Sequence, residues 1–322
     1  MSITIQQFQA EDSDNWDRFC EDAFQSTLLH TRRFLSYHGE RFTDRSLILT
    51  ENGRWLGLFP AALIPGGAFD AIKIGSHPGS TYGGIVHQGG LQGARMLTAF
   101  EKIAGHYAGE GVGALSYKAV PGFYHRVPAQ DDLYALFRLG ARRVRCDISS
   151  TIDLANRRKP SERRRRSLRK AVEAGVKMVE GNGYLRGFWD ILEANLARRH
   201  DAKPVHTLEE IVRLAESFPK EIRCVCGMVD GRMVAGTVLF LTATTVHTQY
   251  IAATEEGFSL SALDAVFDHC LLVAGENGHR WLDFGTSNEH DGHYLNEGLY
   301  VFKSEFGGGG TVYETYELDL RQ

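Results

Sequence analysis

The run WLDFGTSNEHDGHYLNEGLYVFKSEFGGGG, residues 281–310, is the most informative part of the chain. It begins with a strand pattern, breaks at Gly285 into a polar loop, returns to a helical pattern and ends in four glycines. The run is dense in side chains that exchange protons: Asp283, Glu289, His290, Asp291, His293 and Glu297. Because α/β folds place their chemistry in polar loops at the ends of buried strands, we expect a functional site here.

The order of elements in this part of the chain also occurs earlier. Three pairs of residues share one and the same offset in numbering, namely Ala108 and Ala274, Leu133 and Leu299, and Asp153 and Asp319. Two hairpin turns, Asn52-Gly53 and Asp230-Gly231, stand slightly further apart, so the first copy carries a short insertion after its hairpin. Similarity at one offset indicates a duplicated unit. The sequence therefore predicts an α/β protein with mixed sheets, built from two tandem domains that meet near residue 155.

The composition is that of an ordinary globular protein. The net charge of −4 predicts no general attraction to nucleic acid. No apolar run approaches the roughly 20 residues that a membrane-spanning helix requires, and the first residues carry no secretory signal pattern. The five cysteines are an odd number without the spacing of a disulfide framework. We therefore expect a protein of the reducing, cytoplasmic compartment with no membrane span.

Four segments of the sequence carry a resemblance to a known family. They are RRRRSLRKAVEAGV (163–176), LARRHDAKPVHT (196–207), RWLDFGTSN (280–288) and GLYVFKSEFGG (298–308). Together with the duplicated order of elements, they resemble the Fem-type peptidyltransferases and their acetyltransferase-like relatives, in which two GNAT acyltransferase domains follow one another. The resemblance covers both halves of the chain and is most specific in its C-terminal part.

The resemblance implies an N-acyltransferase that moves an acyl group to an amine in cell-envelope or polysaccharide metabolism. The first domain (1–155) would help to hold the acceptor, and the second (156–322) would be catalytic. Acyl-CoA is the favoured donor, because the chain has no room for the long helical hairpin of some aminoacyl-tRNA-dependent members. Aminoacyl-tRNA is the second candidate donor, and a non-catalytic ligand-binding protein of this fold is the alternative from another class.

Asp283 and Lys303 are the predicted catalytic residues. Asp283, placed at the end of a strand, would accept a proton from an attacking ammonium, or would instead cap backbone N–H groups of the loop. Lys303 would stabilise an oxyanion or hold a phosphate, or would instead be a solvated helix residue. The first copy supplies a comparison, because the common offset places Tyr117 and Phe137 at these two positions. The acid and the cation are thus particular to the second copy.

The turn TEEGFSLSA, residues 254–262, is the predicted pyrophosphate site for an acyl-CoA donor. In GNAT proteins that use acyl-CoA, this turn offers backbone N–H groups at the start of a helix, and Gly257, Ser259 and Ser261 would do so here. The two glutamates ahead of Gly257 would repel a pyrophosphate unless they point away. The alternative is that one of the serines only caps the following helix.

Further side chains are predicted to contact ligands. The candidates for substrate binding are Tyr250, Arg199, His200, His77, Tyr82 and His293. The run 157–170 is strongly basic, with Glu162 as its one acidic residue, and Arg163, Arg166 and Lys170 share a helical face within it. This face could be an anion patch or an ordinary solvated surface. His290 and His293 lack a third ligand at a defined spacing, so we expect no metal.

Overall fold

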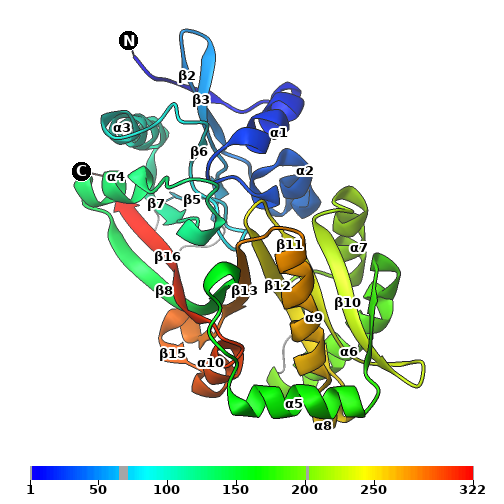
Figure 1. Cartoon of the computed structure of the whole chain (residues 1–322). Coiled ribbons are helices and arrows are strands. Elements are labelled where there is room, and N and C mark those ends of the chain that lie inside the picture. The colour runs from blue at the N-terminus through cyan, green and yellow to red at the C-terminus, as the bar shows by residue number, and fades with distance from the viewer. Residues whose placement is uncertain (1, 65–71, 201–202, 322) are drawn as a thin grey trace. The chain divides into compact units, whose positions relative to one another are not determined.

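The computed structural model describes residues 2–64, 72–200 and 203–321, with Arg199 and His200 described by their backbone alone. The chain forms two compact units (Figure 1). The first unit comprises Met1–Asp147 with Val312–Gln322, and the second comprises Ile148–Thr311. Two strands, β8 (Arg142–Asp153) and β16 (Gly309–Asp319), pass through the division points, so each contributes residues to both units.

The first unit combines two groups of strands with helices. Its elements are β1 (Thr4–Gln7), α1 (Ser13–Asp22), α2 (Arg32–Leu35), β2 (Leu47–Glu51), β3 (Arg54–Phe59), β4 (Ala62–Leu63), β5 (Ile72–Gly75), β6 (Val86–His87), α3 (Ala94–Gly109), β7 (Val112–Lys118) and α4 (Asp131–Arg138). The strand orders are β1-β2-β3-β6 and β4-β5-β7-β16. The core lies where α3 packs on these strands, with Phe100, Ile103 and Leu115 wholly buried.

The C-terminal segment belongs to the first unit because it pairs with a strand there. Residues 315–319 of β16 run antiparallel to residues 114–118 of β7. The division expected near residue 155 placed this segment in the second domain, and in this respect the structure differs from the expectation. A linear division of a duplicated sequence cannot anticipate a last strand that pairs within the other copy.

The second unit is a sheet with helices on both faces. Its elements are α5 (Glu162–Glu173), β9 (Lys177–Glu180), α6 (Leu185–His200), α7 (Leu208–Ser217), β10 (Ile222–Val229), β11 (Arg232–Leu241), β12 (Thr245–Ala253), α8 (Glu255–Ser259), α9 (Ala262–Glu276), β13 (Trp281–Thr286), β14 (Asn288–Glu289), β15 (Tyr294–Leu295) and α10 (Glu297–Ser304). The strand order is β8-β13-β12-β11-β10-β9. Consecutive strand residues point to opposite faces. Ile251 accordingly packs on the α9 side, whereas Tyr250 meets Trp189 of α6.

The predicted α/β class and the predicted duplication are both confirmed. Helix α10 matches α4 at the same offset as the sequence anchors, at its first and at its last residue. The two predicted hairpins, β2–β3 and β10–β11, are also present. Their turn residues Asn52, Gly53, Asp230 and Gly231 all have positive φ, between 48° and 76°. Turns of this kind match the twist of the adjoining strands, which is why Asn-Gly and Asp-Gly favour tight hairpins.

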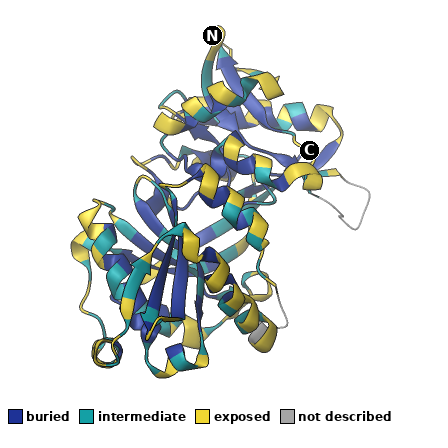
Figure 2. Ribbon diagram, turned by 90° about the vertical axis from the view of Figure 1, so that its right-hand side faces the viewer, coloured by how far each residue is buried: buried dark blue, intermediate teal, exposed yellow. Residues whose placement is uncertain are grey.

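Burial follows the layers of each unit. Figure 2 shows buried residues concentrated in the strands and exposed residues on the outer faces of the helices. In the second unit, the aromatic rings of Phe267 on α9, Phe284 on β13 and Phe306 meet at centroid distances of 5.0–5.4 Å. In the described part of the chain, no helix combines the length and the apolar character needed to cross a membrane.

Candidate functional site

The site is built where the ladder between strands β12 and β13 ends. These strands are parallel, and their described pairing joins Thr245–His247 to Trp281–Asp283. Beyond this point the register of β12 against β11 shifts near Gln249. The register of β13 against β8 also shifts, between Asp283 and Thr286. Register shifts of this kind bend strands, so the backbone ladder stops directly after His247 and Asp283.

His247 and Asp283 form a hydrogen-bonded pair at the end of this ladder. His247 Nδ1 lies 2.7 Å from Asp283 Oδ2. The carboxylate is completely buried, whereas the His247 side chain is 13% exposed. Both residues point away from α9, because their neighbours Val246 and Leu282 belong to the core beneath that helix. An imidazole that solvent can reach is therefore held by a carboxylate that solvent cannot reach.

Two hydroxyl groups of β8 complete the surroundings of the carboxylate. Ser149 Oγ and Thr151 Oγ1 both donate to Asp283 Oδ1, the second at 2.9 Å. Asp283 is the register partner of Thr151, so the contact is fixed by strand pairing. Oδ2 of the same carboxylate faces His247. Asp283 also lies inside β13 and not at its end, because the strand continues to Thr286.

The pair has the geometry of a general base with its orienting acid. When Asp283 is ionised, its carboxylate only accepts hydrogen bonds, and the proton between the two side chains lies on His247 Nδ1. The neutral imidazole then carries its lone pair on Nε2, where it can accept a proton. This division of roles, in which one nitrogen is held and the other reacts, recurs in unrelated enzymes.

Lys303 is buried beside this pair. Its Nζ donates to the carbonyl oxygens of Gly285 and Thr286 at 3.0 and 2.8 Å, and the residue is 5% exposed. Burial lowers the pKa of Lys303 to about 8, while the charge of Asp283 acts in the opposite direction. The alternative reading of Lys303 as a solvated helix residue is therefore wrong. In the first unit, the matching residue Phe137 is 76% exposed.

His247 was not among the predicted site residues, although the sequence contains a signal for it. In TVHTQYIAAT (245–254), His247 is a polar residue in a strand whose neighbours Val246 and Tyr250 are buried. The signal becomes specific only when β12 is set parallel to β13 in the correct register, with His247 opposite Asp283. That register depends on the tertiary structure, because His247 and Asp283 are 36 residues apart in the sequence.

The predicted pyrophosphate turn is closed into a short helix. Thr254 caps α8 by accepting from the Gly257 N–H at 3.0 Å. A Cβ at Gly257 would lie 2.0 Å from the Val234 carbonyl oxygen, so this glycine permits close packing. The hydroxyl of Ser259 donates back to the Glu256 carbonyl, and Ser261 precedes α9 without a side-chain cap. Thr254 thus caps α8, and neither Ser259 nor Ser261 caps a helix with its side chain.

The glutamates of this turn are compensated by arginines. Glu255 pairs with Arg198, and Glu256 forms a bidentate pair with Arg232 at 3.0 Å. At the start of α9, Asp264 binds Arg164 at 2.8 Å. Burial outweighs this arginine and raises the pKa of Asp264 to about 6. The first turn of α9 therefore holds a carboxylate that is part of the fold.

The predicted acceptor residues of the first unit are buried. His77 and Tyr82 are each 4% exposed. The His77 ring packs between those of His38 and Phe42, and burial lowers its pKa to about 3. Tyr82 packs on Tyr124 at a centroid distance of 4.7 Å. Both side chains therefore contribute to the packing of the glycine-rich segment, and their contact with a substrate stays a prediction.

The remaining predicted substrate residues are scattered. Tyr250 is 9% exposed, and its hydroxyl lies 2.6 Å from His206 Nδ1. Burial raises the pKa of Tyr250 to about 12. His293 is exposed after β14, in the loop that leads to α10. The side chains of Arg199 and His200 lie outside the described residues. Among the described ones, Tyr250 shares strand β12 with His247, and His293 lies in a different segment.

The basic run forms the amphipathic helix α5, and its residues have different environments. Arg164 is nearly buried against Asp264 and lies over the ring of Phe302. Arg163 is 55% exposed and pairs with Glu305 at 2.7 Å. Arg166 and Lys170 are exposed on the helix surface. The predicted anion patch stays a prediction, with Arg163 partly neutralised by Glu305.

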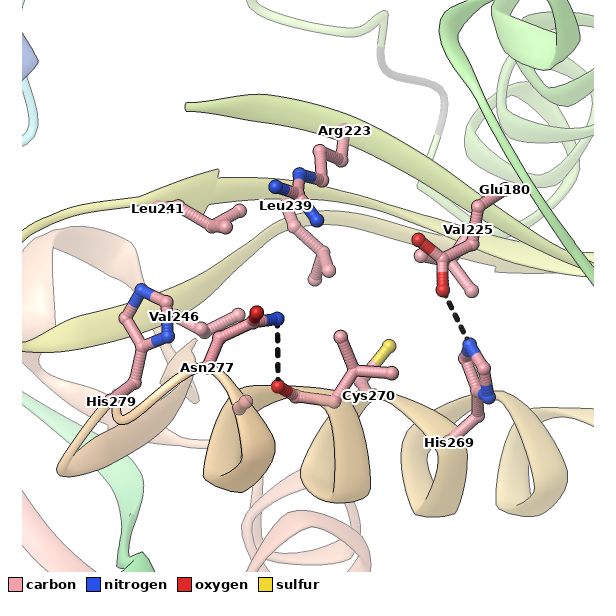
Figure 3. Close-up of a pocket in the computed structure, with 12 residues that line it drawn as sticks. Glu180, Arg223, Val225, Leu239, Leu241, Val246, His269, Cys270, Asn277 and His279 are labelled. Carbon is pink, nitrogen blue, oxygen red and sulfur yellow. Dashed lines mark hydrogen bonds and ion pairs between the residues drawn. The ribbon is translucent and has the colours of Figure 1, made fainter. Parts of the chain in front are cut away.

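One pocket of the second unit lies on the opposite side of the sheet from His247. Figure 3 shows it between α9 and strands β10 to β12, with His269 bonded to Glu180. The two atoms that form this contact are 2.6 Å apart. The volume of the pocket is about 20 Å³, which is room for roughly one water molecule. It belongs to the packing of α9 and does not extend the site.

Comparison with known proteins agrees with this architecture. Residues 155–294 match the family described as "Acetyltransferase (GNAT) domain". No curated protein gives a significant match to the chain. The structure of FemX is similar, with a TM-score of 0.73 and 12% identity over 98% of this chain and 97% of that one.

Two further solved structures are similar over nearly the whole chain. The C-terminal domain of a putative lysylphosphatidylglycerol synthetase from Agrobacterium fabrum has a TM-score of 0.63 at 12% identity, covering 96% of this chain and 92% of that one. A tandem GNAT protein from the clavulanic acid biosynthesis pathway has a TM-score of 0.54 at 12% identity, covering 100% and 99%. At identities this low, the similarity in structure shows the fold alone. The chain is therefore a protein of the GNAT fold, built from two GNAT-like halves and similar over nearly its full length to FemX and to tandem GNAT proteins.

Proposed function

We propose that the chain is an N-acyltransferase in which His247 is the general base and Asp283 orients it. The observation that carries the proposal is the 2.7 Å hydrogen bond between His247 Nδ1 and Asp283 Oδ2, at the end of the β12–β13 ladder. The sequence suggested Asp283 as the base. In this proposal His247 is the base, and Asp283 holds its imidazole in place. A base in this position can take a proton from an amine at neutral pH.

The reaction is direct attack of an amine nitrogen on the carbonyl carbon of an activated acyl group. As the C–N bond forms, the carbonyl oxygen becomes an oxyanion and His247 Nε2 takes the proton that the nitrogen gives up. The carbonyl then re-forms, the bond to the leaving thiol or hydroxyl breaks, and the imidazolium returns the proton to the leaving group. Holding the partners in place and stabilising the oxyanion supply the acceleration.

Lys303 is the cation that we assign to the oxyanion. Two of its three N–H groups donate to Gly285 and Thr286, which fixes the ammonium and leaves its third donor for the developing charge. Its burial strengthens this contact, because a charge interacts more strongly in a poorly solvated site. Lys303 is thus held in place before the reaction begins, as effective electrostatic catalysis requires.

The second unit is the proposed catalytic half, because the first has Tyr117 and Phe137 at the positions that match Asp283 and Lys303. The residue of the first unit that matches Asp283 at the common offset is Tyr117. Its hydroxyl donates to Asp132 at 2.6 Å and accepts from the Ile85 N–H, so it is used within the core. We assign the first unit to holding the acceptor, an amine from cell-envelope or polysaccharide metabolism as the family resemblance implies.

The turn between β12 and α9 bears on the donor. The Gly257 N–H is used by Thr254, and the first turn of α9 already contains the Asp264 carboxylate. An acyl-CoA donor would therefore place its pyrophosphate elsewhere. The exposed Arg166 and Lys170 are the candidates to receive it, because their helix α5 packs on α9. An aminoacyl ester such as aminoacyl-tRNA is the second candidate, and the closed turn favours it.

Thermal-shift titration with acetyl-CoA, free CoA and aminoacyl-tRNA separates the two donors. A ligand at 100 times its dissociation constant adds about 2.7 kcal/mol to the free energy of unfolding. Stabilisation by acetyl-CoA and CoA would support the CoA version, and stabilisation by aminoacyl-tRNA alone would support the ester version. Stabilisation by none of the three would count against both.

The role of His247 is tested with the donor that binds. Transfer to a panel of amine acceptors is followed by mass spectrometry for the wild type, His247→Gln and Asp283→Asn. We expect both variants to bind the donor normally and to lose about 10²-fold to 10⁴-fold in rate. Full activity of His247→Gln would overturn the assignment of the base. If the wild type binds a donor and transfers nothing, the non-catalytic alternative holds.

A further inference from the structure

Two hydroxyl groups donate hydrogen bonds to Asp283 Oδ1, the carboxylate oxygen that does not face His247. Thr151 Oγ1 lies 2.9 Å from Asp283 Oδ1, and Ser149 Oγ contacts the same oxygen. Ser149 and Thr151 are two residues apart on β8, so both side chains point to the same face of the sheet. Both are buried, at 0% and 4% exposure. The carboxylate is thus approached by donors on each of its oxygens.

Counting protons fixes the direction of these bonds. An ionised carboxylate cannot donate, so the single hydroxyl proton of Thr151 goes to Asp283. Thr151 Oγ1 also lies 2.5 Å from the hydroxyl oxygen of Thr311 on β16. Because the proton of Thr151 is already used, Thr311 must donate in this contact. The bonds therefore run from Thr311 to Thr151 and from Thr151 to Asp283, and such chains polarise one another.

We infer that Thr151 is a positioning residue for His247, with Ser149 and Thr311 in support. Two hydroxyl donors on Oδ1 fix the plane of the carboxylate, so that Oδ2 is presented to His247 Nδ1. A fixed carboxylate selects the imidazole tautomer with its proton on Nδ1 and its lone pair on Nε2. The inference rests on the proposed function, because only a base needs one tautomer. Second partners of this kind commonly change activity 10-fold to 100-fold when removed.

The test compares two substitutions at Thr151 that separate the hydroxyl group from the shape of the side chain. Thr151→Val keeps the shape and removes the hydroxyl, whereas Thr151→Ser keeps the hydroxyl and removes a methyl group. Thr237→Val is the matched control, because Thr237 is a wholly buried strand residue whose Oγ1 has no hydrogen-bond partner within the described chain. His247→Gln identifies the His247 signals, and circular dichroism confirms that each variant is folded.

Two measurements report on His247 without any substrate. Nitrogen-15 NMR of labelled histidine gives the populations of the two tautomers. Carbethoxylation by diethyl pyrocarbonate at neutral pH, followed by peptide mass spectrometry, gives the reactivity of the unprotonated nitrogen. In Thr151→Val we expect a second tautomer to appear and the carbethoxylation rate of His247 to fall about 10-fold. Thr151→Ser and Thr237→Val should stay within about 2-fold of the wild type.

Each outcome decides the inference. If Thr151→Val matches Thr237→Val in both measurements while Asp283→Asn changes them, Thr151 does not position His247 and the proposed function is untouched. If both measurements change as expected but His247→Gln retains acyl transfer, the proposed function fails and the positioning stands. If Thr151→Val does not fold, Thr311→Val takes its place. Thr311 is one hydrogen bond further from Asp283 than Thr151 is, so Thr311→Val should change both measurements in the same direction but by less. If Thr311→Val changes neither measurement, the inference is overturned.

Discussion

Gly285 lies directly against the imidazole of His247. A Cβ at Gly285 would be 3.3 Å from His247 Cε1, and the backbone there has a φ of +72°. The glycine lies within the register shift of β13 against β8, between Asp283 and Thr286. It therefore serves both the backbone of the strand and the space that the His247 ring occupies.

Gly285→Ala should reduce acyl transfer more than it reduces stability. The positive φ costs an alanine roughly 1–2 kcal/mol, and the new methyl group pushes the His247 ring by a few tenths of an ångström. Gly278→Ala is the matched control, because Gly278 has a φ of +78° and no heavy atom within 4 Å of its Cβ position. Urea unfolding should give similar losses for both, and only Gly285→Ala should lose about 10-fold in transfer rate. Equal transfer rates would contradict the contact.

Lys303→Met should abolish most transfer through loss of the oxyanion partner, about 10²-fold to 10³-fold. Lys118→Met is the control, because Lys118 of the first unit is a buried lysine with similar hydrogen bonds, although it does not match Lys303 in position. Its Nζ also donates to two carbonyl oxygens, those of Pro78 and Ser80, and burial likewise lowers its pKa to about 8. Both variants should lose stability in urea, and only Lys303→Met should lose transfer. A comparable loss of transfer in Lys118→Met would show that burial of the lysine, and not its charge at the site, is what matters.

The wild-type transfer rate should also fall as the pH rises above about 8. The sign follows from the lowered pKa of Lys303, which keeps the ammonium charged below about 8 and neutral above it. The rate is measured across pH 6.5 to 10 with a saturating donor. A rate that stays constant up to pH 10 would mean that the charge of Lys303 does not contribute to the reaction.

Gly257→Ala should destabilise the second unit because its methyl group would overlap the Val234 carbonyl oxygen. Overpacking of a tight site costs about 1–3 kcal/mol. Gly275→Ala in α9 is the control, since nothing lies within 4 Å of its Cβ position, and it should stabilise the helix by about 0.5–1 kcal/mol. Chemical unfolding measures both. A Gly257→Ala variant with normal stability but weaker binding of acyl-CoA would restore the pyrophosphate role for this turn.

Arg164→Ala should be far more damaging than Arg163→Ala, although the two are neighbours in the basic run. Arg164 and Asp264 are 10% and 5% exposed, so removing the arginine leaves a buried carboxylate, at a cost of about 3–5 kcal/mol. Arg163 is 55% exposed, and its pair with Glu305 is expected to contribute about 1 kcal/mol or less. Differential scanning calorimetry compares the two. Equal melting temperatures would show that Arg164 is not a structural residue.

His77→Asn should make the protein less sensitive to acid. Burial lowers the pKa of His77 to about 3, so the folded state binds this proton less well than the unfolded state. The stabilisation is fully present above the unfolded pKa of about 6.5 and is lost as the pH falls below it. Between pH 6.5 and 5 one such group accounts for about 2 kcal/mol. Urea unfolding at both pH values should show that the free energy of unfolding changes by that much less in the variant than in the wild type. An equal change in both proteins would contradict the prediction.

Local patterns predicted much of the fold. Asn52-Gly53 and Asp230-Gly231 predicted both hairpins, because tight turns depend on residues that accept positive φ. The common offset between the two copies predicted the duplication and the matching helices α4 and α10. Comparison of the two copies also singled out Asp283 and Lys303 against Tyr117 and Phe137, and the structure places Lys303 beside the pair that Asp283 forms with His247.

The remaining contacts of Asp283 join residues that are far apart in the sequence, so sequence patterns do not predict them. His247 meets Asp283 only because β12 and β13 are parallel and in one particular register. Ser149 and Thr151 reach the same carboxylate from a strand that is distant along the chain. The burial of Lys303 and its two carbonyl acceptors also depend on the tertiary structure.

The sequence by itself determined the duplication and the hairpins and singled out Asp283 and Lys303, because these depend on neighbours in the chain or on comparison of its two copies. The tertiary structure decided that Asp283 pairs with His247, that the turn at Gly257 is closed, and that His77 and Tyr82 are buried. It also decided that residues 315–319 pair with residues 114–118. Each of these depends on strand register and packing between distant segments, where a shift of one residue turns every side chain to the other face of the sheet.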